Sequence, residues 1–474
     1  MDRLTQDAAL PDTVRAPRFH RNAHGYGMVH IGVGAFHRAH QAPATDDALE
    51  EEGGDWRTIG VSLRRPHVAD ALNPQDGLYT LLTRGGDAPP RVIGNLGPVL
   101  GPLHSANDAI LAAMTAPATR VVTVTVTEKG YGLDRQTGAP DATDPAVAAD
   151  LAAAAAGALE APKSLPGLIA AALIIRRAKG LRPFTTLSCD NLPHNGNVLK
   201  SLVLGVAPEA EKAALEACAF PSSMVDRITP AATPKTLSDA VAALGLEDRA
   251  AIETEPFTQW VIEDHFPEGR PAWEAGGALF VSDVAPHEAM KLRMLNGAHS
   301  LIAYLGQLHG LELVRHVTAV PQHRAAVAAH MAAAAATLPP VPGVDLDDYA
   351  AALLARFDNP AIAHKTRQIA MDGTQKLGPR IFLPALDAVK KGTETAPFAR
   401  VVGLWMAYAL RAAKDGTLDD PEAKAIADAG RSDDPMDALA KAASMPPDLR
   451  THAPFWQSVE AAWRQGSAKS QGSS

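Results

Sequence analysis

The chain has 474 residues, a formal net charge of −9 and a pI near 6.0, so it is long enough for two or three domains. Its 46% apolar and 20% charged residues are typical of a globular protein, and the acidic charge argues against nucleic acid as a partner. The two cysteines, Cys189 and Cys218, exclude a disulfide framework and a cysteine-rich zinc site. The N-terminus lacks the apolar core of a signal peptide, and no apolar run approaches the ~18 residues of a membrane span. We therefore expect a cytoplasmic protein without a membrane partner.

Strand and helix patterns alternate along the first part of the chain. In order, they predict a strand at 27–33, a helix at 39–51, strands at 56–63 and 120–127, helices at 145–158 and 165–179, and a strand at 184–189. Such alternation predicts a doubly wound parallel sheet. After about residue 285 helical periodicity dominates, and the predicted helices cover 291–305, 317–336, 346–357, 361–371, 398–413 and 435–443. We therefore predict an α/β domain over residues 1–285 and a mostly α-helical domain over residues 286–474.

A glycine turn, Gly32-Val33-Gly34, follows the first predicted strand and precedes a helix. Glycines at such a turn let backbone amides approach a pyrophosphate at the helix N-terminus. His37 stands where the usual dinucleotide fingerprint has a third glycine, so a plain strand-to-helix turn remains the alternative. The strand and helix around the turn favour a nucleotide site.

The second predicted strand ends in Ser62-Leu63-Arg64-Arg65. An acidic residue at this position commonly binds the ribose hydroxyls of NAD, whereas arginine can face the 2′-phosphate of NADP. The two arginines leave the choice between NAD and NADP open, and they could also be ordinary solvated surface.

Three more polar segments follow predicted strands or apolar residues. Thr127-Glu128-Lys129 and the turn containing Asn191 come after strands, and ligands of open sheets bind beyond the carboxyl ends of strands. The Asn191 amide could hold an alkoxide or carbonyl oxygen, although the turn composition alone explains that segment equally well. Glu128 and its neighbour could instead form an exposed ion pair. Asp226, bracketed by apolar residues, belongs to a buried ion pair or a polar site.

The segment from Glu288 to His299 carries the strongest chemical signal. At ~100° per residue, a helix places Glu288, Lys291, Asn296 and His299 within roughly a 140° arc, interleaved with leucines. A lysine on such a buried face can lose its proton near neutral pH and act as the base for an alcohol. The alternative is an amphipathic helix with solvated charges. Because the chain has no Tyr-x-x-x-Lys and no His-Glu-x-x-His, we expect neither a tyrosine base nor a metal.

Together these segments resemble the mannitol dehydrogenase family, the polyol-specific long-chain dehydrogenases. They occur in the family's order and span roughly residues 27–380. The matching segments are GVGAFHRAHQ (32–41), TVTEKGY (125–131), SCDNLP (188–193), MVDRITP (224–230), EPFTQWVIED (255–264) and KLRMLNGAH (291–299).

The resemblance implies a Rossmann-type N-terminal domain, a helical C-terminal domain and an active site in the cleft between them, with NAD as the cofactor and no metal. It implies Lys291 as the general base and His299 as a partner of a substrate hydroxyl. The other implied catalytic residues are Asn191 and Asn296 as oxyanion donors, Asp226 near the substrate and Glu288 as a proton relay. The predicted cofactor-binding residues are Gly32, Gly34, Ala35, Phe36, Arg64, Thr127 and Glu128.

Within the family, residues 290–306 and 367–377 are most similar to fructuronate reductases, also called D-mannonate oxidoreductases. Their substrate carries a carboxylate, so a cation should face it, and Lys376, Arg367 and Arg380 are the candidates. We thus expect hydride transfer between NAD and D-mannonate or D-fructuronate, in carbohydrate metabolism. A mannitol 2-dehydrogenase or D-arabinitol dehydrogenase is the alternative, and a non-catalytic NAD-binding sensor is a remote one. The expected partner is a sugar acid or polyol, and the expected state is a monomer or weak oligomer.

Overall fold

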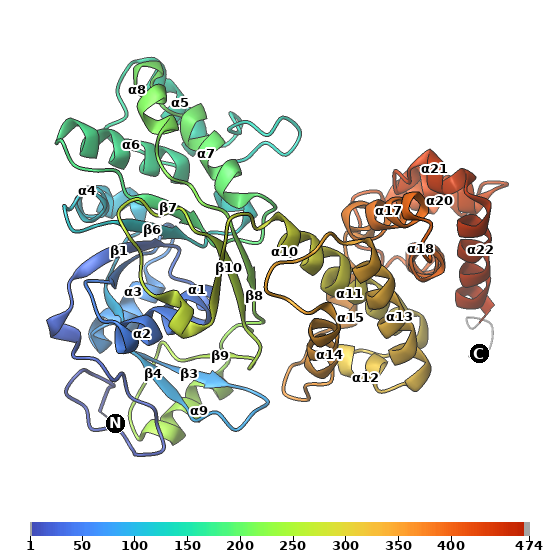
Figure 1. The fold of residues 1–474 in the computed structure, drawn as a ribbon, viewed down its shortest axis with the longest axis horizontal. Coiled ribbons are helices and arrows are strands. Elements are labelled where there is room, and N and C mark those ends of the chain that lie inside the picture. Colours follow the sequence, from blue (N-terminus) through green and yellow to red (C-terminus); the bar gives the residue numbers. More distant parts are fainter. Residues whose placement is uncertain (1, 469–474) are drawn as a thin grey trace. The chain divides into compact units, whose positions relative to one another are not determined.

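The chain folds into two compact units, Met1–Ala285 and Pro286–Ser474 (Figure 1). The structure, a computed structural model, describes residues 2–468. The first unit contains sheets and helices, whereas the described part of the second unit, residues 286–468, contains no strand beyond an isolated bridge between Leu313 and Lys365. The predicted fold class, a Rossmann-type α/β domain followed by a mostly helical domain, is confirmed.

The main sheet of the first unit has five strands in the order β5-β2-β1-β6-β7, and every neighbouring pair is parallel. This order places β1 at the centre of the sheet, with crossovers to both sides, as a doubly wound fold requires. The strands are β1 (Tyr26–Ile31), β2 (Arg57–Val61), β5 (Leu96–Leu100), β6 (Val121–Val124) and β7 (Thr185–Ser188).

Side chains alternate between the two faces of this sheet, and both faces are buried. Val29 and Ile31 of β1 pack into one core together with apolar side chains of α4, α6 and α7. Met28 points to the opposite face, into a core that includes Trp260 and Trp273. Because both faces of the sheet are buried, the strands consist largely of continuous apolar residues.

Two small mixed sheets complete the first unit, and neither was predicted from the sequence. One has the order β4-β3-β9 and the other β11-β10-β8, each with one antiparallel and one parallel pair. Their strands are β3 (Tyr79–Thr83), β4 (Arg91–Ile93), β8 (Ser223–Asp226), β9 (Ile252–Thr254), β10 (Gln259–Glu263) and β11 (Ala278–Val281). The helices of this unit are α1 (Ala35–Ala39), α2 (Gln41–Glu51), α3 (His67–Leu72), α4 (Leu103–Met114), α5 (Pro145–Ala155), α6 (Leu165–Ala178), α7 (Asn195–Gly205), α8 (Glu209–Glu216) and α9 (Pro234–Leu244), with short 3₁₀ turns at Arg21–Ala23, Asn73–Gln75, Glu128–Gly130 and Trp273–Gly276.

The second unit is built around α11 and α18, which have 11 of 13 and 13 of 19 residues buried. Helices with such wide apolar surfaces need several neighbours, and α13, α15 and α22 pack against them. Among residues 2–468, no helix is both long and apolar enough to cross a membrane. The helices are α10 (Ala285–Met290), α11 (Gly297–His309), α12 (Val314–Thr318), α13 (Pro321–Thr337), α14 (Leu346–Phe357), α15 (Thr366–Ala370), α16 (Gly373–Leu377), α17 (Leu383–Lys391), α18 (Ala396–Lys414), α19 (Ala423–Ala429), α20 (Pro435–Ala442), α21 (Pro447–Thr451) and α22 (Ala453–Ala468), with π-helices η5 (Lys291–Asn296) and η6 (Gly378–Phe382).

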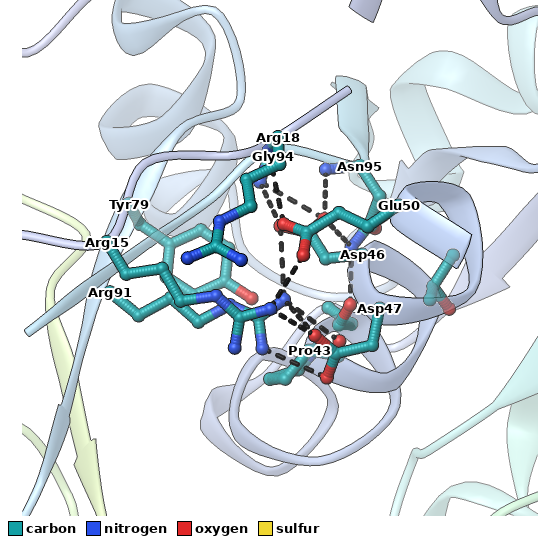
Figure 2. Close-up of polar contacts among 12 residues, drawn as sticks. Arg15, Arg18, Pro43, Asp46, Asp47, Glu50, Tyr79, Arg91, Gly94 and Asn95 are labelled. Atoms are coloured by element: carbon teal, nitrogen blue, oxygen red, sulfur yellow. Dashed lines mark hydrogen bonds and ion pairs between the residues drawn. The ribbon is translucent and has the colours of Figure 1, made fainter. Parts of the chain in front are cut away.

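A buried carboxylate joins α2 to the turn between β4 and β5 (Figure 2). Asp46 is fully buried and accepts hydrogen bonds from the backbone N–H groups of Gly94 at 2.9 Å and Asn95 at 2.7 Å, and from the Asn95 side chain at 2.7 Å. The Arg91 guanidinium lies 3.8 Å away. Arg15 and Arg91 both reach the neighbouring Asp47 at the more exposed side of this cluster (Figure 2).

Burial outweighs these favourable contacts and raises the pKa of Asp46 from 3.8 to about 6. A raised pKa means that the folded state holds the proton more tightly, so this group makes the protein less stable as pH rises through about 4 to 6. We expect the free energy of unfolding of the wild type, relative to Asp46→Asn, to fall by about 2 kcal/mol between pH 4.5 and 7.5. Urea denaturation of both proteins at the two pH values measures this difference. A difference that does not change with pH would show that Asp46 titrates at its ordinary value.

Candidate active site

The glycine turn lies directly after β1 and forms one wall of a pocket of about 740 Å³ in the first unit. Gly32 has φ of +100°, and a Cβ there would lie 2.0 Å from the backbone oxygen of Thr125, so only glycine fits without a shift. Gly34 follows with its N–H 2.6 Å from the Gly32 oxygen, and α1 begins at the next residue. The turn therefore leaves backbone rather than side chains at the pocket wall, as close approach of a pyrophosphate requires.

The predicted cofactor residues are distributed differently around this pocket. Gly32, Gly34, Arg64 and Thr127 line it. Ala35 and Phe36 begin α1 and are not among the lining residues, and the Phe36 ring instead packs edge-on against a histidine ring at 5.1 Å. The side chain of Glu128 lies outside the described part of the structure, which gives only its place in a 3₁₀ turn.

His37, which replaces the third glycine of the usual fingerprint, has a structural place in the turn. Its ring stacks on that of His30 with centroids 3.4 Å apart and planes at 11°. Burial holds the pKa values of both histidines below the ordinary value, to about 3 for His30, so both rings are neutral near pH 7. The His30 ring also contacts the hydroxyls of Thr123 at 2.7 Å and Thr125 at 2.9 Å. The stacked rings therefore connect α1, which follows the glycine turn, to β1 and to the neighbouring strand β6.

The pocket wall after β6 is fixed by Asp190, a residue that the sequence did not single out. The Asp190 carboxylate accepts hydrogen bonds from the N–H groups of Val126 at 2.9 Å and Thr127 at 3.0 Å, and from the hydroxyl of Tyr131 at 3.0 Å. Thr127 has a positive φ of +68°, which is uncommon for a residue with a side chain. Burial raises the pKa of Tyr131, so its hydroxyl remains a donor. Asp190 lies in the SCDN segment, which was the only signal available to find it.

Asn191 and Asp226, the two other candidates of the first unit, differ in exposure. Asn191 follows Asp190 and is exposed, whereas Asp226 ends β8 and is 7% exposed. The neighbouring Arg227 donates to the backbone oxygens of Glu255 and Ala39. Burial lowers the pKa of Arg227 to about 10, which leaves the guanidinium charged.

The lysine segment of the second unit is not a continuous α-helix. Residues Lys291–Asn296 form a π-helix between α10 and α11, and the Gly297 N–H donates to the Leu292 oxygen five residues back. The sequence predicted one continuous α-helix at ~100° per residue. The π-helix has one more residue per turn, so the directions predicted for the side chains of Lys291 and His299 relative to each other are wrong. Single π-turns inside helices are frequent at functional sites because they re-aim side chains. Lys291 and His299 are each 9% exposed, and Glu288 and Asn296 are half-buried.

Of the three cations predicted to face a carboxylate, the structure brings Arg380 to the lysine segment. Arg380 lies in π-helix η6, and its Nη1 is 3.3 Å from both the Asn296 backbone oxygen and the Ser300 hydroxyl. Lys376 instead donates to the backbone oxygens of Met371 at 2.5 Å and Ile369 at 3.3 Å. Arg367 is exposed on α15.

A pocket of this volume lies within the usual range for ligand sites, and it combines a glycine turn at a helix start with exposed cations. This combination is typical of a dinucleotide-dependent oxidoreductase. Among residues 2–468, no group of three or more histidine, cysteine, aspartate or glutamate side chains is arranged to hold a metal ion.

Comparison with known proteins identifies the family. The model of the mannitol dehydrogenase Rossmann domain matches residues 26–275, and that of the mannitol dehydrogenase C-terminal domain matches residues 283–466. The chain belongs to the mannitol dehydrogenase family. It is therefore an oxidoreductase of the NAD-dependent polyol dehydrogenase kind.

Three relatives show how far the likeness extends. The chain is 41% identical to the uncharacterized oxidoreductase YeiQ of Escherichia coli, covering 96% of this chain and 95% of that protein. It is 42% identical to the D-mannonate oxidoreductase of the same organism, covering 87% and 86%. The solved structure of Pseudomonas fluorescens mannitol 2-dehydrogenase, a ternary complex with NAD and D-mannitol, has a TM-score of 0.80 at 35% identity and covers 99% of this chain and 97% of that one.

Proposed function

We propose that this enzyme interconverts D-mannonate and D-fructuronate at C5 by hydride transfer, with Lys291 as the general base. The observation that carries the choice of a sugar acid is Arg380, a half-buried guanidinium beside Asn296 whose described hydrogen bonds go only to neutral oxygens. A half-buried cation whose neighbours are neutral is well matched by a carboxylate, which D-mannonate has and a polyol lacks. The 42% identity to a D-mannonate oxidoreductase supports the same choice.

Each candidate residue has a distinct task in this proposal. The Lys291 amine takes the proton of the substrate hydroxyl during oxidation, and the amides of Asn191 and Asn296 donate hydrogen bonds to the oxygen as it becomes an alkoxide. Burial, and then the nearby cations, lower the pKa of His299 well below its ordinary value, so its neutral ring can donate to a substrate hydroxyl. Asp226 orients the substrate, and Glu288 relays the proton from Lys291 toward water.

The first unit holds the cofactor in this proposal. NAD, when bound, accepts the hydride from the alcohol carbon. The backbone at Gly32 and Gly34 fits a pyrophosphate, and Arg64 and Arg65 line the same pocket after β2. Both arginines are exposed, and neither forms an ion pair with a carboxylate among the side chains that the structure describes. Because no acid follows β2 to repel a 2′-phosphate, we expect NADP to bind as well as NAD.

The substrate assignment is tested with a panel of alcohols and both coenzymes. We expect kcat/KM for D-mannonate to exceed that for D-mannitol, D-arabinitol and D-altronate by about 100-fold, because only the matched substrate satisfies every buried polar group. Steady-state rates with NAD and NADP at equal concentration measure the comparison. Preference for mannitol or arabinitol over mannonate would assign the enzyme to the polyol dehydrogenases instead. Absence of turnover on every member of the panel, with NADH still bound, would favour the sensor.

A further inference from the structure

Arg293 lies in the π-helix η5, two residues after Lys291, and has no task in the proposed mechanism. Its guanidinium is half-buried and reaches two other helices of the second unit. Nη1 donates to the Thr337 hydroxyl at 2.9 Å and to the Thr337 backbone oxygen at 3.2 Å, at the end of α13. Nη2 lies 2.8 Å from the Asp387 carboxylate of α17. One side chain therefore ties the π-helix to both α13 and α17.

The end of α13 is a well-defined anchor for a cation. Thr337 is 3% exposed, and its hydroxyl donates to the Ala334 backbone oxygen at 2.7 Å. The Lys391 amine, from the end of α17, donates to the same Thr337 backbone oxygen at 2.8 Å. The last carbonyls of a helix carry partial negative charge and lack partners within the helix, so both cations are stabilised there. A half-buried, charge-assisted contact of this kind holds a side chain more firmly than an exposed ion pair does.

A second contact with α13 fixes the other end of the π-helix. Gly297 follows directly after Asn296, and a Cβ at Gly297 would collide with Nε2 of His330 on α13. His330 is fully buried, and its ring packs edge-on against that of Phe398 with centroids 5.4 Å apart, so it cannot give way without disturbing the core. The contacts of Arg293 and Gly297 thus hold both the middle and the end of the π-helix against α13.

We propose that Arg293 is a positioning residue that holds the π-turn by its anchor on α13 and α17 and so directs the Lys291 amine toward the reacting hydroxyl. This inference rests on the proposed role of Lys291 as the general base. Residues two apart point to different sides of a helix, so the anchor sets the rotation of the segment without occupying the side that carries Lys291. Without the anchor, the segment can relax toward an ordinary α-helix, which has fewer residues per turn and changes the direction of Lys291 relative to His299.

The test measures steady-state rates and their pH dependence with the best substrate of the panel. Arg293→Gln should lower kcat about 30-fold, while KM and NADH affinity change less than about threefold, because the base is misplaced but binding is retained. The rising limb of the kcat profile should also move to higher pH, because a loosened segment lets water reach the Lys291 amine, and a hydrated amine keeps its proton to higher pH. Arg293→Lys keeps the charge and a donor for the Thr337 oxygens, so it should restore part of the rate.

Two further variants make the result specific to this anchor. Asp387→Asn removes the ion pair but leaves the Thr337 contacts, so it should lower kcat by only about fivefold and move the limb in the same direction. Arg324→Gln is the matched control, because Arg324 is also half-buried and forms an ion pair with Asp358 at 2.6 Å, at the other end of α13. It should keep the wild-type kcat and pH profile.

The possible outcomes separate this inference from the proposed function. A wild-type rate in Lys291→Ala refutes the proposed base, whatever Arg293→Gln does. If Lys291→Ala is inactive but Arg293→Gln keeps the wild-type kcat and pH profile, only the anchor is refuted. A lower melting temperature of Arg293→Gln without a change in kcat or in the pH limb assigns Arg293 to stability alone, which also refutes it. If Arg293→Gln does not fold, the same two measurements on Asp387→Asn decide the question.

Discussion

Replacing Lys291 by alanine should lower kcat for mannonate oxidation by about three orders of magnitude, because the alcohol proton loses its acceptor in the transition state. The loss should appear in kcat rather than in cofactor affinity. Lys291 belongs to the second unit, whereas the residues lining the cofactor pocket all belong to the first. Titration with NADH, followed by its fluorescence, should therefore give the wild-type dissociation constant.

The pH dependence of the rate and a control substitution of an exposed lysine show whether the loss comes from removing the base. A base must be unprotonated to act, so the wild-type rate should rise with pH until the base is deprotonated, and Lys291→Ala should lack this limb. Lys414, exposed near the end of α18, gives the control Lys414→Ala, which should behave as the wild type. If Lys291→Ala retained a rate within tenfold of the wild type, Lys291 would not be the base.

The central fold was predictable because one physical rule governs it. A strand buried on both faces must be apolar throughout, and segments such as Val121–Val124 show this clearly in the sequence. The two mixed sheets were not predictable by the same rule. Strands β4 and β9 have three residues each, too few for any periodicity, and the partners of β8 and β9 are set by tertiary contacts far away in the chain.

For the candidate site too, some features could be predicted from the sequence and others could not. Lys291 and His299 share one short segment, so their joint burial could be predicted from spacing. The π-turn between them could not be predicted, because no composition rule marks it. Phe357 and His364 lie more than fifty residues from His299 in sequence, and their rings pack against the His299 ring only through the folding of α14 and the loop after it. Sequence spacing carries no information about contacts of that kind.

The glycine turn provides the other large expected effect. Gly32→Ala should lower the free energy of unfolding by at least about 3 kcal/mol, because the new Cβ would meet backbone at a positive φ, where L-residues are strained. The nearest atom is the Thr125 oxygen at 2.0 Å, and the N–H of the same residue donates to the Ile31 oxygen. Thr125 therefore cannot move away without breaking the hydrogen bond that joins the ends of β1 and β6. We also expect NADH affinity to fall sharply, because the displaced turn no longer offers its backbone to the pyrophosphate.

Gly34→Ala is the matched control within the same turn. Gly34 has a negative φ of −91°, and a Cβ there would find its nearest atom at 3.7 Å, which is ordinary contact. Its stability should change by less than about 0.5 kcal/mol. Urea denaturation and NADH titration of the two variants in parallel separate a folding defect from a binding defect. If both variants were equally stable, the strain at Gly32 would be absent. If Gly32→Ala were unstable but bound NADH normally, the turn would serve only the fold and the dinucleotide would bind elsewhere.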